Sequence, residues 1–125
     1  MNQPYTIPPH TRIGHVHLKV SDLQRALDFS CGLLGFELMT TYGPDAAFIS
    51  AGGYHHHIGF NTWLSKKGPK PPHNAVGLYH LAILYPTRRD LAVALDRLRQ
   101  AGYPLRGASD HGVSEALYLE DPDGN

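Results

Sequence analysis

A chain of 125 residues is long enough to bury one hydrophobic core and too short for two independent ones. Eleven Lys and Arg balance eleven Asp and Glu, so no net charge attracts nucleic acid or an anionic membrane, and a small-molecule partner is expected. Cys31 is the only cysteine, which excludes an internal disulfide and indicates a reducing compartment, the cytoplasm. No stretch approaches the ~20 apolar residues of a membrane span. Nine histidines are the unusual feature, because histidine is the commonest metal ligand.

Residues 13–20 alternate between two kinds of side chain, which predicts a strand. One face carries apolar residues such as Val16 and Leu18, and the other carries His15 and His17. The apolar face is expected to pack against a core, and the histidine face is available for chemistry. His17 is expected to line a cleft beside His15.

A helix is expected directly after this strand. Ser21 followed by Gln24 is typical of a capping box, and apolar residues at helical spacing continue up to Gly35, a typical helix C-terminus. Gly-Pro and Gly-Gly signals then separate three short strands, expected near residues 36–42, 46–51 and 55–62. The first unit is therefore predicted to be βαβββ.

A second unit follows the connector "SKKGPKPPHN", residues 65–74, whose prolines cannot enter a central strand. Residues 78–85 predict a strand that contains His80. Thr87 is a typical helix N-cap, and the apolar stripe that follows it ends at Gly102. The second unit therefore begins like the first.

Two more strands are expected near residues 104–106 and 115–120. The sequence "DPDGN", residues 121–125, is a strong turn signal. A hairpin partner is expected after this turn, so the last strand of the second unit would be truncated.

The two units predict an α+β protein in which the order of elements repeats. We expect one domain over residues 1–125, with repeat one at about 13–62, a linker at 63–77 and an incomplete repeat two at 78–125. In such a pseudo-twofold arrangement His15 and His80 occupy equivalent positions and can converge on one metal ion.

The sequence resembles the vicinal oxygen chelate superfamily, which holds glyoxalase I, bleomycin- and fosfomycin-resistance proteins and extradiol ring-cleaving dioxygenases. "GHVHLKVSDLQRALDFSCGLLGFEL" is similar to the family's opening strand, helix and leucine-glycine turn, and "YLEDPDGN" is similar to its closing hairpin. The resemblance implies a U-shaped, half-open barrel of mixed sheet that holds a divalent metal, with His15 and His80 as two of the ligands. The carboxylate ligand is expected just beyond Asn125, so these two histidines form an incomplete triad.

Within the superfamily, "HHHIGF" is similar to the histidine-rich fourth strand of extradiol dioxygenases, which carries an acid–base histidine. The alignment of this string selects His56, whereas strand alternation turns His57 toward the cleft and His56 toward the core; both stay candidates. His111 and Tyr118 are similar to the histidine and tyrosine that contact substrate and oxygen in that branch.

We therefore expect a metal-dependent extradiol dioxygenase of the catechol 2,3-dioxygenase kind, which uses Fe(II) or Mn(II) and dioxygen on a small aromatic diol. One alternative is a non-catalytic binding or resistance protein of the same fold, and another is a glyoxalase-type isomerase or lyase. Glyoxalases typically use a glutamate in the fourth strand of each unit, and no acidic residue lies between Asp45 and Asp90. We also expect a homodimer, because the fold often dimerises and a missing strand favours pairing between chains.

Overall fold

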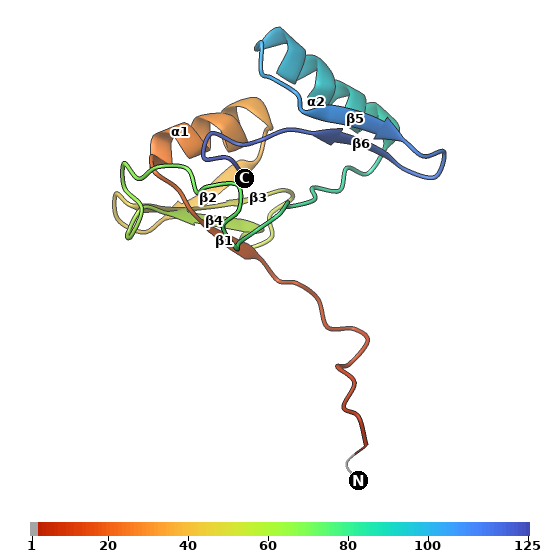
Figure 1. Cartoon of the computed structure of the whole chain (residues 1–125), viewed down its shortest axis with the longest axis horizontal. Coiled ribbons are helices and arrows are strands. Elements are labelled where there is room, and N and C mark those ends of the chain that lie inside the picture. The colour runs from red at the N-terminus through yellow and green to blue at the C-terminus, as the bar shows by residue number, and fades with distance from the viewer. Residues whose placement is uncertain (1–2) are drawn as a thin grey trace.

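The computed structural model describes residues 3–125 (Figure 1). The first half holds β1 (Val16–Lys19), α1 (Leu23–Leu27), the π-helix η1 (Asp28–Leu33), β2 (Glu37–Thr41), β3 (Ala46–Ser50) and β4 (Ile58–Asn61). The second half holds α2 (Arg88–Gln100), β5 (Gly107–Asp110) and β6 (Glu115–Tyr118). The α+β class is confirmed, and the first half has the predicted βαβββ order. Within residues 3–125, no helix has the length and apolar character needed to cross a membrane.

The first half forms a four-stranded mixed sheet in the order β1-β4-β3-β2. β1 runs parallel to β4, with Val16 opposite Ile58, and β3 runs antiparallel to β4, with Ile49 opposite Ile58. α1 covers the face that these residues share (Figure 1). Ile49 is 0% exposed, and burial of such a side chain stabilises the fold by about 1.5–3 kcal/mol. The buried core cluster consists of Val20, Ala26, Ile49, Ile58 and Phe60.

The N-cap of α1 differs from the predicted one. Asp22, rather than Ser21, caps the helix: its side chain accepts a hydrogen bond from the Arg25 backbone N–H at 2.9 Å. The Ser21 hydroxyl instead donates to Asp123 Oδ1, 102 residues away in the chain. α1 continues into η1, and Gly35 follows at φ 89°, which agrees with the predicted helix end.

The second half consists of α2 and a β-hairpin. Thr87 caps α2 as predicted, because its hydroxyl oxygen accepts a hydrogen bond from the Asp90 backbone N–H at 3.1 Å. Gly102, at φ 66°, follows the helix. The strand predicted near 104–106 lies slightly later, as β5, and β6 lies within the predicted range 115–120.

The strand predicted at residues 78–85 does not form. This segment belongs neither to the four-stranded sheet nor to the two-stranded β5–β6 sheet. Leu81 packs against the buried core cluster, whereas Tyr79 is 96% and Leu84 is 95% exposed. A strand needs a partner for its backbone N–H and C=O groups, and within the described residues β6 pairs with β5 alone. The second half is therefore a helix and a hairpin, and the predicted barrel is not confirmed.

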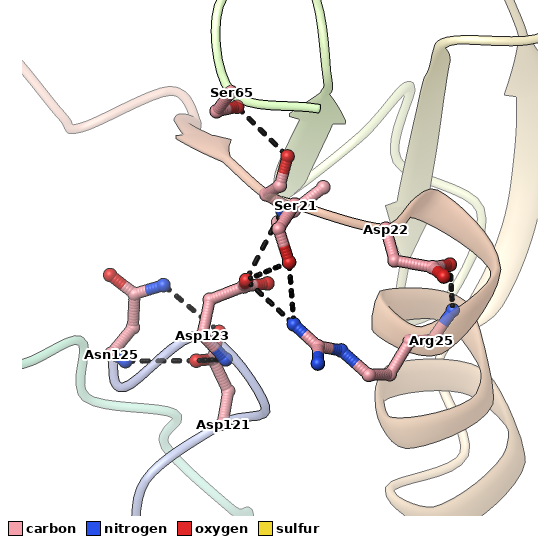
Figure 2. Close-up of polar contacts among 8 residues, drawn as sticks. Ser21, Asp22, Arg25, Ser65, Asp121, Asp123 and Asn125 are labelled. Atoms are coloured by element: carbon pink, nitrogen blue, oxygen red, sulfur yellow. Dashed lines mark hydrogen bonds and ion pairs between the residues drawn. The ribbon is translucent and has the colours of Figure 1, made fainter. Parts of the chain in front are cut away.

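Polar contacts join the two halves at the start of α1 (Figure 2). Asp123 Oδ1 accepts hydrogen bonds from the Ser21 N–H at 3.1 Å and the Ser21 hydroxyl at 2.8 Å, and it pairs with Arg25 at 2.9 Å. The turn that carries Asp123 is closed by Asp121, whose Oδ1 accepts from the N–H groups of Asp123 and Asn125. The predicted turn is confirmed, and it docks on the first half.

Candidate functional site

The face of the four-stranded sheet that points away from the core carries the histidines that the sequence analysis predicted to be functional. His17 on β1 and Phe48 on β3 both lie opposite Gly59 on β4, so their side chains share this face. The Trp63 ring lies 6.1 Å from the His17 ring, centroid to centroid. We call this surface the open face, and it is made by His15, His17, Phe48, His56 and Trp63.

His15 and His56 lie together on the open face. Their ring centroids are 4.2 Å apart, and the His56 ring also lies 4.9 Å from the Phe48 ring. His55 extends the cluster: its Nδ1 is 2.9 Å from His56 Nδ1, so one of these two nitrogens donates to the other. The expectation that strand alternation turns His56 toward the core is wrong, because β4 begins only at Ile58 and the three consecutive histidines precede it.

His57 contacts the turn between β3 and β4. Its Nδ1 lies 3.2 Å from the Ala51 backbone nitrogen and 3.2 Å from Ser50 Oγ, and its ring packs 4.8 Å from the Tyr54 ring. The two candidate acid–base histidines therefore have different surroundings. The catalytic roles of His56 and His57 stay predictions.

Desolvation lowers the pKa of two histidines on the open face. The pKa of His56 is lowered from 6.5 mainly by burial, and further by the positive charge that His15 and the other nearby histidines would carry. Burial, followed by the charge of His15, also lowers the pKa of His17. Both imidazoles are therefore mainly neutral at pH 7.

Two residues of β4 that sequence reasoning missed shape the open face. Asn61 Nδ2 lies 2.8 Å from His17 Nε2, and Asn61 Oδ1 accepts a hydrogen bond from the Trp63 N–H at 3.1 Å. Gly59 lies beside the His17 ring, and a Cβ at this position would be only 2.7 Å from His17 Nδ1. A signal existed for Gly59, because a glycine within a strand often marks the close approach of another group.

The remaining predicted site residues lie elsewhere. His80 is exposed, and its ring lies 5.7 Å from the ring of Tyr79. His111 lies in the turn of the β5–β6 hairpin, and Tyr118 on β6 is 46% exposed. Figure 1 shows this hairpin beside α2 and away from β1. The structure therefore does not bring His111 or Tyr118 to the open face.

The described residues do not fit a complete divalent-metal centre. Among residues 3–125, no group of three or more His, Cys, Asp or Glu side chains is arranged to hold a metal ion. A facial triad needs two histidines and a carboxylate around one ion. His80 comes from the segment 78–85, which is not paired with the sheet beside His15. The roles of His15 and His80 as ligands stay predictions.

Sequence comparison defines the family. The Glyoxalase/Bleomycin resistance protein/Dioxygenase superfamily matches residues 12–125, and the chain belongs to this superfamily. A catechol-2,3-dioxygenase of Bacillus subtilis strain 168 is 44% identical over 101 residues, which cover 80% of this chain and 35% of that protein. Biphenyl-2,3-diol 1,2-dioxygenase 3 of Rhodococcus globerulus is 30% identical over 120 residues, which cover 96% of this chain and 62% of that protein. The chain thus spans less than two thirds of the length of these curated relatives.

Solved structures agree on the fold. A lactoylglutathione lyase from Agrobacterium tumefaciens superposes with a TM-score of 0.71 at 21% identity, covering 94% of this chain and 91% of that one. A glyoxylase/bleomycin resistance protein/dioxygenase domain from Frankia sp. EAN1pec gives a TM-score of 0.73 at 22% identity, covering 91% of each chain. At these identities the likeness concerns the fold alone.

Proposed function

We propose that the chain is part of an extradiol ring-cleaving dioxygenase that acts on a small aromatic diol with dioxygen. The observation that carries this proposal is the similarity to three proteins named as catechol or biphenyl-diol dioxygenases. The half-buried imidazole of His56 on the open face supports it, because its pKa is lowered mainly by burial and a diol must lose a proton before its ring is opened.

His56 is the proposed acid–base residue. It is half-buried between His15 and Phe48, and its lowered pKa leaves the imidazole free to take a proton from a diol hydroxyl at neutral pH. Phe48 supplies an apolar edge beside it for an aromatic ring. A divalent cation, Fe(II) or Mn(II), belongs to the proposal as cofactor. The described residues do not form its complete centre.

The test is a ring-cleavage assay. The assay uses the protein with the carboxylate-bearing strand that is expected after Asn125, because the described residues alone do not form the complete metal centre. This protein is incubated with Fe(II) or Mn(II) under nitrogen and then mixed with catechol in air-saturated buffer, and absorbance follows the yellow ring-opened product. We expect product from the wild-type protein, and His56→Gln should lower the rate by about 10²–10⁴-fold, the usual contribution of a general base. His73→Gln, an exposed histidine in the proline-rich connector, is the matched control and should leave the rate unchanged. Catechol binding without product from this metal-loaded wild-type protein would overturn the proposal and favour a binding protein.

A homodimer in the cytoplasm is also part of the proposal. The single cysteine supports a reducing compartment. Within the described residues β6 has one unpaired edge, and Leu84 and Val113 expose 95% and 96% of their surfaces, features that favour pairing between chains. Sedimentation equilibrium tests the dimer, and a monomer mass at every concentration would contradict it. Fractionation of the source cells tests the location.

A further inference from the structure

The orientation of the Asn61 amide determines where His17 carries its proton. Asn61 is 9% exposed, and its Oδ1 accepts a hydrogen bond from the Trp63 backbone N–H at 3.1 Å. The other end of the amide, Nδ2, therefore faces His17 Nε2 at 2.8 Å. An amide NH₂ group can only donate, so His17 Nε2 accepts, and the proton of the neutral imidazole is on Nδ1.

The position of the His17 ring is fixed as well. His17 lies directly opposite Gly59 in the β1–β4 register, and a Cβ there would be 2.7 Å from Nδ1 and 3.0 Å from Cε1 of the ring. The ring therefore occupies space that only a glycine leaves free. The Phe48 ring meets it at 5.8 Å, nearly perpendicular at 80°. His17 thus has one position and one tautomer.

His57 is fixed in the opposite tautomer. The Ala51 backbone N–H can only donate, so His57 Nδ1, 3.2 Å away, accepts, and the proton of neutral His57 is on Nε2. The Ser50 hydroxyl lies at 3.2 Å from the same Nδ1. Neither His17 nor His57 keeps a ring lone pair that is free to accept a proton.

We propose that Asn61 is a positioning residue that fixes the proton of His17 on Nδ1, so that the open face offers the lone pair of His56, and not that of His17, to a substrate hydroxyl. This inference rests on the proposed function for the identity of the substrate. It also selects between the two acid–base candidates, because the Nδ1 lone pair of His57 is already engaged by Ala51. His56 can act as the base through Nε2 only when its own proton is on Nδ1. In that tautomer the Nδ1–H donates to His55 Nδ1, 2.9 Å away.

Nitrogen-15 NMR of the histidine rings tests the tautomers directly. Two-bond proton–nitrogen correlations at pH 8 distinguish protonated from unprotonated ring nitrogens, and His→Gln variants assign the signals. We expect the proton on Nδ1 in His17 and on Nε2 in His57. Asn61→Asp keeps the acceptor for the Trp63 N–H and replaces the amide donor by a carboxylate oxygen, so the His17 proton should move to Nε2. A wild-type His17 protonated on Nε2, or no change in Asn61→Asp, would overturn the proposal.

Chemical modification of the wild-type chain gives a second measurement, which does not depend on whether a variant folds. Diethyl pyrocarbonate acylates an imidazole nitrogen that has a free lone pair, and peptide mapping by mass spectrometry locates the products. His10 and His73 are exposed references in the same chain. We expect His17 and His57 to react up to about tenfold more slowly than these references, the factor that corresponds to one net hydrogen bond. Reaction of His17 at the reference rate would overturn the proposal. A protein that has the expected tautomers and the carboxylate-bearing strand but does not cleave catechol would refute the proposed function and not the positioning role of Asn61.

Discussion

Asp123 Oδ1 accepts a hydrogen bond from Ser21 Oγ at 2.8 Å, although 102 residues separate the two in the chain. The Ser21 N–H and the Arg25 guanidinium donate to the same oxygen at 3.1 Å and 2.9 Å (Figure 2). One carboxylate therefore holds the final turn of the described chain against the start of α1. Hydrogen bonds to a charged group contribute about 1.5–3 kcal/mol, more than neutral ones.

Replacement of Asp123 by Ala should therefore lower the free energy of unfolding by about 1.5–3 kcal/mol. Ser21→Ala removes the hydroxyl that donates to Asp123 and accepts from Arg25 at 2.6 Å but keeps the Ser21 N–H contact, so it should cost about 1.5 kcal/mol, at the low end of the range for bonds to charged groups. Urea denaturation with far-ultraviolet circular dichroism measures both. Equal stability of Asp123→Ala and the wild-type chain would mean that the turn does not stabilise the first half in solution.

Arg97 should be the main polar link between α2 and the first helical segment. Its Nε donates to the Leu33 carbonyl and its Nη2 to the Gly32 carbonyl, both at 2.9 Å. We expect Arg97→Ala to cost about 1–2 kcal/mol, because two hydrogen bonds to helix-end carbonyls are lost. Arg97→Lys should recover only part of this, since an ammonium group lacks the planar fork. Arg99→Ala, on the same helix, is the control for the loss of a surface charge, and an equal loss in both variants would contradict the link.

Gly59→Ala should destabilise the chain through the His17 ring. The new Cβ would lie 2.7 Å from His17 Nδ1, so the ring or the strand must move. Such overpacking typically costs about 1–3 kcal/mol. At Gly77 a Cβ would meet no described atom within 4 Å, so Gly77→Ala is the matched control and should be neutral within about 1 kcal/mol. Thermal unfolding compares the two variants, and identical midpoints would mean that the His17 ring does not lie over Gly59.

Stability should fall when the solution is acidified below pH 6.5. The folded-state pKa values of His17 and His56 are lowered from 6.5, so the unfolded chain binds protons first as the pH decreases. The stability contribution of these neutral histidines is therefore complete above pH 6.5 and is lost toward their lower folded-state pKa values. Urea denaturation at a series of pH values measures the slope, and His56→Gln should make it shallower. If His56→Gln left the slope unchanged, the pKa of His56 would be the same in the folded and the unfolded chain.

Local sequence patterns were sufficient for much of the first half. The alternation of residues 13–20 predicted β1 and its two faces, because a strand places successive side chains on opposite sides whatever its partner is. Thr87 was correctly predicted as an N-cap, and Gly35 and Gly102 as helix ends, because caps depend on residues only a few positions away. His15 was placed on the histidine face by the same alternation.

The remaining features were decided only by the tertiary structure, because each depends on residues that are distant in the chain. Residues 78–85 form an almost continuous apolar run that predicts a strand, yet they form none, because no neighbouring strand within the described residues satisfies their backbone groups. Ser21 does not cap α1: Asp22 accepts from the Arg25 N–H, and the Ser21 hydroxyl donates to Asp123, 102 residues away. Strand alternation could not orient His56, because the chain turns just before β4 begins. The lone pair of His17 is fixed by Asn61, 44 residues away, a constraint that exists only once β1 and β4 pair.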